Sequence, residues 1–355
     1  MAGLYIHIPF CRQACHYCNF HFSTNLSIQD RMIRAIVAEL DGKHDYLAEQ
    51  AVGSIYIGGG TPSLLTQQQL ELIMNSISKK YQLEESVEIT LEANPEDINA
   101  DYLKMLISTG INRLSIGIQS FDEADLEFMN RAHNGAQSLK ALEAIKSSNM
   151  DQLCVDLMFG LIKSDSKTWE ANLVRLLSFT PDHISCYNLT IEEQTAFHNW
   201  MSKGKIQEIS ENTQYDQFIR SHELLTSAGY HHYEISNFCL PHKPSKHNSN
   251  YWSHGTYLGV GPGAHSFDGL SRQWNISNNA LYLTAIEMDN LYSERETLSQ
   301  IDLYNEFIML NLRQSKGIAE DELLQFDDLI ITHFSKMSVV LIGQNYSIIK
   351  MVDII

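Results

Sequence analysis

Cys11-Arg-Gln-Ala-Cys15-His-Tyr-Cys18, close to the start of the chain, is its most informative stretch. The three cysteines have the spacing C-x3-C-x2-C and follow the run Tyr5-Ile-His-Ile-Pro-Phe10. Three closely spaced thiolates can hold three corners of a cubane iron–sulfur cluster, which leaves one iron without a protein ligand. An open metal position is where another molecule binds, as in catalytic zinc sites. The motif therefore predicts a [4Fe–4S] cluster with an open iron.

Composition limits the classes of function. The chain has 355 residues, 44% of them hydrophobic, which is enough for a large barrel with an extension. Its net charge is −18, so it lacks the basic surface that non-specific nucleic-acid binding requires. It shows no signal-peptide pattern and no apolar run of membrane-spanning length. We therefore expect a cytoplasmic protein, with any membrane contact transient and at an acceptor. The cytosol would keep the six cysteines reduced, as a cluster requires.

Short β-rich runs alternate with amphipathic helical patterns over the first 230 residues, which predicts βαβ units and a parallel sheet. The expected strands are Gly3–Ile8, Ser54–Gly58, Val87–Ala93, Arg113–Ile118, Cys154–Phe159 and His183–Leu189. The expected helices are Ile28–Leu40, Gln67–Tyr81, Ala100–Thr109, Ser138–Ser147, Lys167–Ser178 and Gln207–Gly229. Six units are too few for a closed (β/α)8 barrel, so the predicted fold class is α/β with a partial (β/α)6 barrel.

The chain is expected to divide into three parts. Residues 1–230 form the predicted barrel core. Residues 231–295 are expected to be an extension rich in aromatic residues and histidine, with weak periodicity over 230–275 and an irregular segment indicated by Pro241-His-Lys-Pro244 and Gly259-Val-Gly-Pro-Gly263. Residues 296–355 are expected to form a small, shortened α+β domain, with a helix over Leu298–Asp328 and β-like character over Gln344–Val352.

A zinc site is the alternative for the cysteines, because His7, His16 or His21 could supply the fourth ligand that structural zinc prefers. Position favours the cluster: the triplet lies at the carboxyl end of the first predicted strand, on the face that carries the active site in α/β barrels. The loop Gly58-Gly59-Gly60-Thr61-Pro62 follows the second predicted strand and should share that face. Its glycines would let a ligand approach the backbone and its N–H donors.

With these two loops, further motifs resemble the HemN-like family of radical S-adenosylmethionine (SAM) enzymes. These motifs are His7-Ile-Pro-Phe-Cys11, Tyr17-Cys18-Asn-Phe20, Glu92-Ala-Asn-Pro95, Ser115-Ile-Gly-Ile-Gln119, Arg131-Ala-His133 and Val155-Asp156-Leu-Met-Phe-Gly160. The resemblance covers nearly the whole chain and implies a partial radical-SAM barrel with a small winged-helix-like C-terminal domain. It also implies a [4Fe–4S] cluster whose open iron binds the amino and carboxylate groups of SAM.

The resemblance assigns a role to individual residues. Cys11, Cys15 and Cys18 match the cluster ligands. The residues that match SAM-binding positions are Tyr5, Tyr17, Gly59, Gly60, Thr61, Glu92, Gln119, Arg131 and Asp156. Taken singly, three of them have ordinary alternatives: Arg131 could make a surface ion pair, and Glu92 and Asp156 could cap helices. Their shared position at strand ends favours SAM binding.

The family contains oxygen-independent coproporphyrinogen III oxidase and the HemW-type haem chaperones. The oxidase pattern has a further cysteine where this chain has Phe20, and it usually has an N-terminal extension before the cluster motif. The segment His247-Asn-Ser-Asn-Tyr-Trp252 matches the H-N-x-x-Y-W motif of the chaperones, which implies His247 as a haem ligand. His231, His232, His254 and His265 are rival histidines. The resemblance therefore favours haem as cargo, haem-dependent proteins as acceptors, and an electron donor if SAM is cleaved, with the oxidase as the alternative.

Overall fold

The computed structural model describes residues 1–48, 50–319, 322 and 326. All six predicted strands are confirmed. They are β1 (Ala2–Ile8), β2 (Val52–Gly59), β3 (Leu83–Ala93), β4 (Arg113–Gln119), β5 (Gln152–Phe159) and β6 (His183–Asn188). Each pairs in parallel with the next in chain order, as successive βαβ units require. The predicted α/β class with a partial barrel is therefore confirmed.

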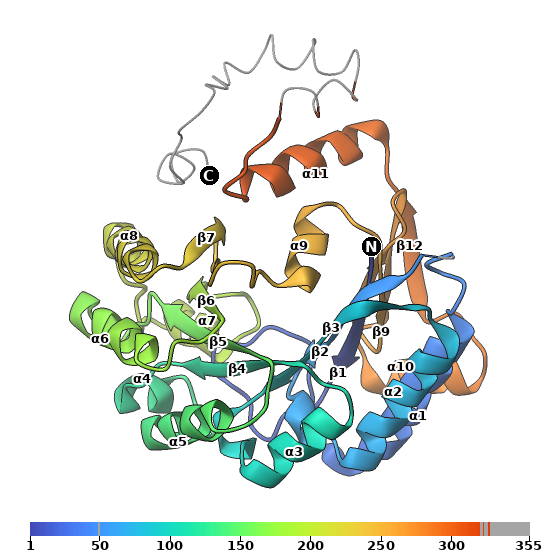
Figure 1. The fold of residues 1–355 in the computed structure, drawn as a ribbon, viewed down its shortest axis with the longest axis horizontal. Helices are drawn as coiled ribbons and strands as arrows, with labels where there is room; N and C mark the ends of the chain where they lie inside the picture. The colour runs from blue at the N-terminus through green and yellow to red at the C-terminus, as the bar shows by residue number, and fades with distance from the viewer. Residues whose placement is uncertain (49, 320–321, 323–325, 327–355) are drawn as a thin grey trace.

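The six predicted helices are also present, and they cover the outer face of the curved sheet (Figure 1). They are α1 (Gln29–Gly42), α2 (Gln67–Lys80), α3 (Ala100–Ser108), α5 (Gly135–Lys146), α6 (Ser166–Leu177) and α8 (Glu211–Ser227). Two short helices were not predicted, α4 (Glu123–Phe128) and α7 (Ala196–Ser202). Single 3-10 turns follow the cysteine loop and the ends of β2 and β3: η1 (Leu26–Ile28), η2 (Pro62–Leu64) and η3 (Pro95–Asp97).

The two faces of the sheet differ in chemistry. In β1, Leu4, Ile6 and Ile8 are fully buried in the core cluster that also contains the apolar faces of the outer helices. The opposite face of neighbouring strands carries polar side chains, among them Ser54 of β2 and Glu88 of β3. Because these polar groups are also buried, they need partners inside the barrel.

Residues 231–297 add regular structure on both edges of the six-stranded core. The added strands are β7 (His231–Glu234), β8 (Asn237–Cys239), β9 (Tyr257–Val260), β10 (His265–Phe267), β11 (Ser271–Asn275) and β12 (Ser293–Thr297). They complete one twelve-stranded sheet in the order β12-β11-β10-β9-β1-β2-β3-β4-β5-β6-β8-β7. The segment between Pro241 and Gly263, expected to be irregular, contains regular structure, with β9 at its end. Strands of three to five residues are too short to show a period, and they form because β1 and β6 offer edges to pair with.

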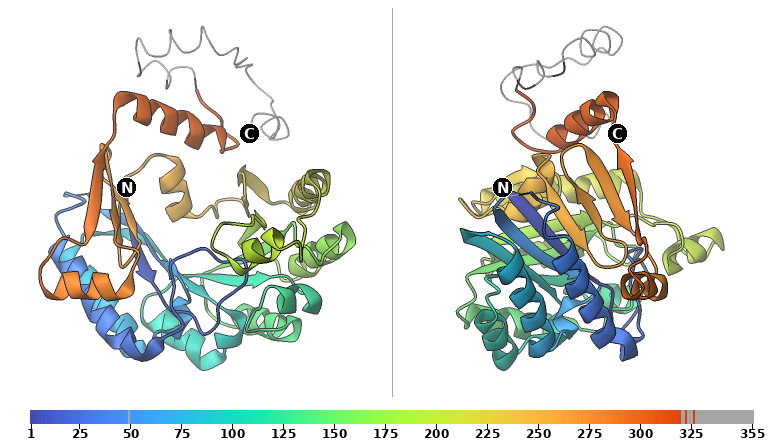
Figure 2. Two further views of the ribbon diagram at one scale, coloured as in Figure 1. Left: turned by 180° about the vertical axis from the view of Figure 1, so that it is seen from behind. Right: turned by 90° about the vertical axis from the view of Figure 1, so that its right-hand side faces the viewer.

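Three later helices complete the described fold. Helix α9 (Lys246–Trp252) lies inside the curve of the sheet, whereas α10 (Asn279–Glu287) packs outside beside α1 (Figure 1). Helix α11 (Gln300–Leu312) starts just after β12, and the Arg313 carbonyl at its end accepts a hydrogen bond from the Ile235 N–H at 3.0 Å. The helix therefore crosses the gap between the two edges of the sheet (Figure 2).

A buried carboxyl group ties the first helix to this late segment. Glu39 of α1 is 2% exposed and accepts hydrogen bonds from the Gly261 N–H at 2.8 Å and the Asn275 amide at 2.7 Å. The Tyr282 hydroxyl of α10 also donates to it. Burial raises the pKa of Glu39 to about 7. One side chain thus joins α1, the loop after β9, β11 and α10.

The C-terminal expectations fall largely outside the described residues. Helix α11 accounts for the start of the predicted helix Leu298–Asp328, while Gln344–Val352 and the winged-helix-like domain lie outside the described part of the chain. In the part that is described, no helix combines the length and apolar character needed to cross a membrane.

Candidate cofactor site

A cavity of about 430 Å³ opens at the carboxyl ends of the parallel strands. It is lined by most of the residues that the sequence singled out: Cys11, Cys15, Tyr17, Cys18, Gly59, Gly60, Thr61, Glu92, Gln119, Arg131 and Asp156. These residues come from five strand ends or the loops after them, which fold next to one another because the strands are parallel and in sequence order. We call this space the strand-end cavity.

The cysteine loop forms one wall of the strand-end cavity. All three cysteines are free thiols that are partly exposed within the loop after β1. In the described residues, no group of three or more His, Cys, Asp or Glu side chains has the geometry to hold a metal ion. A cubane cluster does not need such convergence, because each of its cysteines binds a different iron. The wall therefore suits a cluster seated across the three thiols.

The glycine loop is packed directly against the cysteine loop. The Gly60 N–H donates to the Ile8 carbonyl at 2.9 Å, and the Thr61 N–H donates to the Phe10 carbonyl at 2.6 Å. A Cβ atom on Gly60 would lie 2.5 Å from the Phe10 carbonyl oxygen, so only glycine permits this approach. Gly59 has a φ of +107°, which also favours glycine. The backbone of one loop thus positions the other.

Two carboxyl groups face the cavity from neighbouring parts of the barrel. Glu92 accepts from the Tyr56 hydroxyl at 2.7 Å and from the Gly59 N–H at 3.1 Å. Burial raises the pKa of Glu92 to about 7, and the nearby Asp156 adds to the rise. Asp156 accepts from the Ser115 hydroxyl at 3.1 Å, and burial raises its pKa as well. Both lie on strands, so neither caps a helix, and both would be stabilised as anions by a cationic ligand.

Arg131 lies inside the cavity rather than on the surface. Its guanidinium donates to the Asn94 side chain at 2.7 Å, the Gly117 carbonyl at 2.8 Å, the Tyr17 hydroxyl at 3.3 Å and the Cys15 sulfur at 3.4 Å. Its Nε atom is buried without a hydrogen-bond partner among the described residues. The guanidinium thus ties the cysteine loop to the carboxyl ends of β3 and β4.

Gln119 ends β4 in a strained conformation. Its φ is +66°, which a residue with a Cβ rarely adopts and which costs on the order of 1 kcal/mol. The pairing of β4 with β5 shifts register between Gly117 and Gln119, so the strand bulges where it reaches the cavity. Strain held at a strand end is typical of a residue that is positioned for a ligand.

Two of the predicted residues do not line this cavity. Tyr5 lies deeper in the barrel and donates its hydroxyl hydrogen bond to His7 Nδ1 at 3.0 Å, while His7 Nε2 donates to the His21 carbonyl. His247 lies deeper still, on α9, and is 2% exposed. Both of its ring nitrogens are hydrogen-bonded, Nδ1 to Ser54 Oγ at 2.9 Å and Nε2 to the Tyr251 hydroxyl at 3.2 Å.

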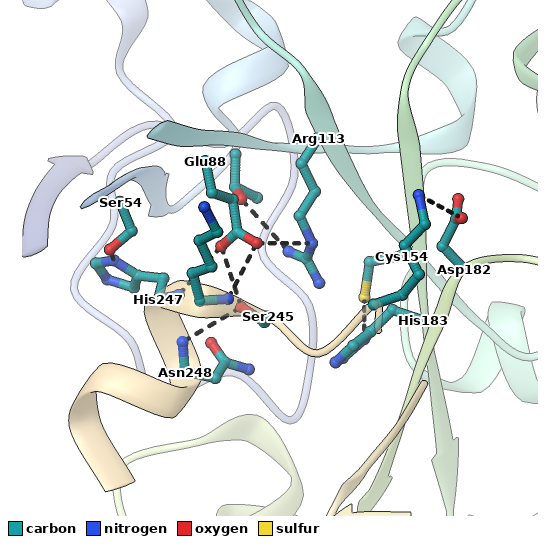
Figure 3. A network of polar contacts seen from close by, with 12 residues as sticks. Ser54, Glu88, Arg113, Cys154, Asp182, His183, Ser245, His247 and Asn248 are labelled. Carbon is teal, nitrogen blue, oxygen red and sulfur yellow. Dashed lines mark hydrogen bonds and ion pairs between the residues drawn. The ribbon is translucent and has the colours of Figure 1, made fainter. Parts of the chain in front are cut away.

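Figure 3 shows why His247 is fixed in this position. The Glu88 carboxylate accepts from the backbone N–H groups of Lys246 and His247 at 3.0 and 3.1 Å, and so anchors the first turn of α9. Arg113 lies 3.9 Å from Glu88 and shares its burial. Burial, with the Arg113 charge, lowers the pKa of His247 to about 3, so its imidazole is neutral. Its location in the barrel interior was not expected from the sequence.

The sequence also missed residues that line the strand-end cavity. Asn94, Ser115, Met158 and Tyr187 all contribute to its wall. Asn94 and Ser115 stand within quoted motifs, so the signal was present, whereas Tyr187 at the end of β6 had only its strand-end position to mark it.

The residues present fit SAM and a cluster. The cavity volume lies in the range of about 300–1,000 Å³ typical of small-molecule sites. It joins three thiols, a glycine loop approachable by a ligand, two carboxyl groups suited to ammonium or hydroxyl groups, and a guanidinium suited to a carboxylate.

Comparison with known proteins supports this chemistry. Residues 5–173 match the Radical SAM superfamily. The chain is 32% identical over 333 residues to the heme chaperone HemW of Lactococcus lactis, a match that covers 94% of this chain and 86% of the relative. The chain belongs to the HemW family. A second HemW, from Haemophilus influenzae, is 34% identical over 97% of this chain and 91% of its own length. The HemW family lies within the radical SAM superfamily, which implies a [4Fe–4S] cluster and SAM.

The solved structures place the fold in the same group. Coproporphyrinogen III oxidase (HemN) from Escherichia coli, described as a radical SAM enzyme, superposes with a TM-score of 0.81. The match covers 94% of this chain and 80% of HemN, at 22% sequence identity. At that identity the likeness establishes the HemN-like fold and not the reaction.

Proposed function

We propose that this protein binds haem and transfers it to haem-dependent acceptor proteins, and that it carries a [4Fe–4S] cluster and SAM in the strand-end cavity. The observation that carries the proposal is the meeting of three cysteines, the glycine loop, Glu92 and Arg131 around one cavity. It occurs in a chain whose relatives in Lactococcus lactis and Haemophilus influenzae are named heme chaperones.

Each part of the cavity has a task in this proposal. Cys11, Cys15 and Cys18 would hold the cluster, and the Arg131 guanidinium, 3.4 Å from the Cys15 sulfur, would hold that side of the cysteine loop in place. Gly59 and Gly60 would let the amino-acid part of SAM approach the backbone, and Glu92 and Asp156 would accept hydrogen bonds from its polar groups. When bound, the cluster supplies a low-potential electron centre to the sulfonium of SAM.

Phe20 supports the chaperone over the oxidase. It lines the cavity where the oxidase pattern has a further cysteine, and it is 68% exposed. An exposed aromatic ring can supply neither a metal ligand nor a thiol to a substrate. The proposal therefore assigns this cavity to the cofactors and leaves the haem to be accommodated elsewhere.

The test is an anaerobic reconstitution followed by titration with haemin. We expect iron and acid-labile sulfide in a ratio near one, cluster absorption, saturable haemin binding by optical spectroscopy, and transfer of the haem to an apo haem protein. Mass spectrometry of the loaded protein would distinguish covalent from non-covalent attachment, and SAM cleavage products would be assayed in parallel.

Two outcomes contradict the proposal. Conversion of coproporphyrinogen III to protoporphyrinogen IX with SAM turnover would make the protein the oxidase. Zinc without iron or sulfide in anaerobic preparations would support the zinc interpretation of the cysteines instead.

A further inference from the structure

A second cavity, of about 380 Å³, lies at the lateral opening of the barrel. It is bounded by α9, the β7–β8 hairpin and the C-terminal end of α11, and we call it the lateral cavity. Its lining residues are Tyr187, Glu234, Ile235, Ser236, Asn237, Asn248, Tyr251, Trp252 and Arg313. Tyr187 also lines the strand-end cavity, so one side chain separates the two spaces.

The lateral cavity combines aromatic surfaces with a cation that pairs with none of the described side chains. Tyr187, Tyr251 and Trp252 supply rings from two elements. The Arg313 guanidinium makes no hydrogen bond or ion pair with any residue that the structure describes. Six other arginines of this acidic chain lie within 4.0 Å of a carboxylate oxygen. An arginine left free in a cavity is suited to a bidentate contact with a carboxylate or phosphate brought by a ligand.

Polar atoms in the same wall also lack partners. Glu234 and Asn237 are 1% and 3% exposed, yet Glu234 Oε1 and Asn237 Oδ1 have no hydrogen-bond partner in the described protein. Trp252 Nε1 is a buried donor that likewise has no hydrogen-bond partner among the described residues. A buried polar group without a partner costs on the order of 1–3 kcal/mol, and a ligand carboxylate would supply an acceptor to the Trp252 N–H and to the protonated form of Glu234.

We infer that the lateral cavity is the cargo site and that it receives a planar ring system bearing carboxylates, with one carboxylate on Arg313 and the ring against Tyr251 and Trp252. This inference rests on the proposed function, because haem has that chemistry. Its volume is at the low end for a ligand site, so part of the ring system would remain exposed at the opening, where an acceptor can reach it.

The position of His247 follows from this arrangement. His247 lies directly behind Tyr251, to which its Nε2 is hydrogen-bonded at 3.2 Å, and the two rings meet edge to face with centroids 4.9 Å apart. The first residue of the H-N-x-x-Y-W segment thus supports the wall, while Asn248, Tyr251 and Trp252 form it. His247 becomes a ligand to the iron only when Tyr251 moves aside.

The test compares haemin with haemin dimethyl ester, whose carboxylates are blocked. Arg313→Leu is expected to weaken haemin binding by about tenfold or more, the usual size of a charge-assisted contact, and to leave ester binding unchanged. Arg34→Leu is the matched control, because Arg34 is exposed on α1. Retained SAM binding would show that Arg313→Leu is folded, since Arg313 is not in the strand-end cavity.

A second variant tests the space itself. Asn248→Trp would fill the lateral cavity and is expected to abolish binding of haemin and of the ester while SAM binding persists. If haemin binds the wild type, and binds Arg313→Leu and Asn248→Trp equally well, the lateral cavity is not the cargo site although the proposed function stands. If haemin does not bind the wild type, the proposed function itself fails.

Discussion

The strand-end cavity and the lateral cavity differ in how far their main charged side chains are already paired. In the first, polar side chains are held by one another: Arg131 makes four hydrogen bonds and Glu92 two, before any ligand arrives. In the second, the Arg313 guanidinium makes no hydrogen bond or ion pair with a described residue, and Glu234 and Asn237 each keep one oxygen without a partner in that part of the chain. A preorganised site holds resident cofactors in one geometry, whereas a site with unused polar groups gains its partners from a ligand that comes and goes.

The largest expected effect is the loss of the cluster without loss of haemin binding. Cys15→Ala should abolish the cluster, measured as loss of iron, sulfide and cluster absorption, because a cubane loses one of its three protein ligands. Haemin affinity should stay within about twofold of the wild type, since Cys15 does not line the lateral cavity. Cys239→Ala, at a buried thiol of β8, is the control that keeps the cluster. Loss of haemin binding in Cys15→Ala would mean that the cavities do not act separately.

Next in size is the removal of the cation that organises the strand-end cavity. Arg131→Met should lower the free energy of unfolding by about 3 kcal/mol, because the Asn94 side chain and the Gly117 carbonyl, both half-buried, lose a charged hydrogen-bond partner. SAM affinity, measured by calorimetry on the reconstituted protein, should fall by at least tenfold. Arg34→Met should change neither quantity, and an equal loss of stability in that control would refute the role given to Arg131.

The pH dependence of haemin binding tests the lateral cavity, whereas the pH dependence of stability also contains Glu39 and Glu92, whose pKa values burial likewise raises to about 7. Burial raises the pKa of Glu234 to about 7. The folded state therefore keeps the Glu234 proton at pH values where the unfolded chain has lost it. Glu234 therefore contributes fully to stability below about pH 4.5, and this contribution is lost as the pH rises through about 7. The resulting fall in the free energy of unfolding is at most about 3 kcal/mol. Ionised Glu234 would also repel the carboxylates of haem, so haemin affinity should fall over the same range.

The neighbouring charges do not reverse this sign. The charged or titratable groups that act on Glu234 are Arg313, Tyr187 and Tyr233. The Arg313 cation opposes the rise in the pKa of Glu234, and the two tyrosine hydroxyls are neutral in this pH range. Glu234→Gln should flatten the pH dependence of haemin binding between pH 5 and 8. Glu92→Gln, in the other cavity, should leave it unchanged, and the reverse result would place the haem in the strand-end cavity.

The smallest expected effect concerns the wall between His247 and the cargo. Tyr251→Phe removes one buried hydrogen bond and should cost about 1 kcal/mol of stability in a denaturant titration. Because His247 Nε2 is then unpaired, the haemin-loaded variant should show the optical spectrum of a histidine-ligated iron more strongly than the wild type does. An unchanged spectrum would show that His247 stays a support in both proteins.

The sequence predicted the elements that are long enough to show a hydrophobic period and the site residues that stand in contiguous motifs. The six parallel strands and their helices run for six residues or more and show a period, and the strand-end residues stand in motifs that fold onto one face. The burial of His247 could not be predicted, because it depends on Ser54 and Glu88, which are distant in the chain. The lateral cavity was missed for the same reason: Tyr187, Glu234 and Arg313 share no motif and meet only through the short strands and α11.

The position of β9 has a consequence for synthesis on the ribosome. Strand β1 pairs with β2 on one side and with β9 on the other, and Glu39 of α1 finds its hydrogen-bond donors at Gly261, Asn275 and Tyr282. The first strand to be made therefore has an unpaired edge, and α1 an unmatched carboxyl group, until the last third of the chain has emerged. N-terminal folding ahead of completion would leave that edge open to other chains, so the nascent protein depends on its late segment to close its earliest one.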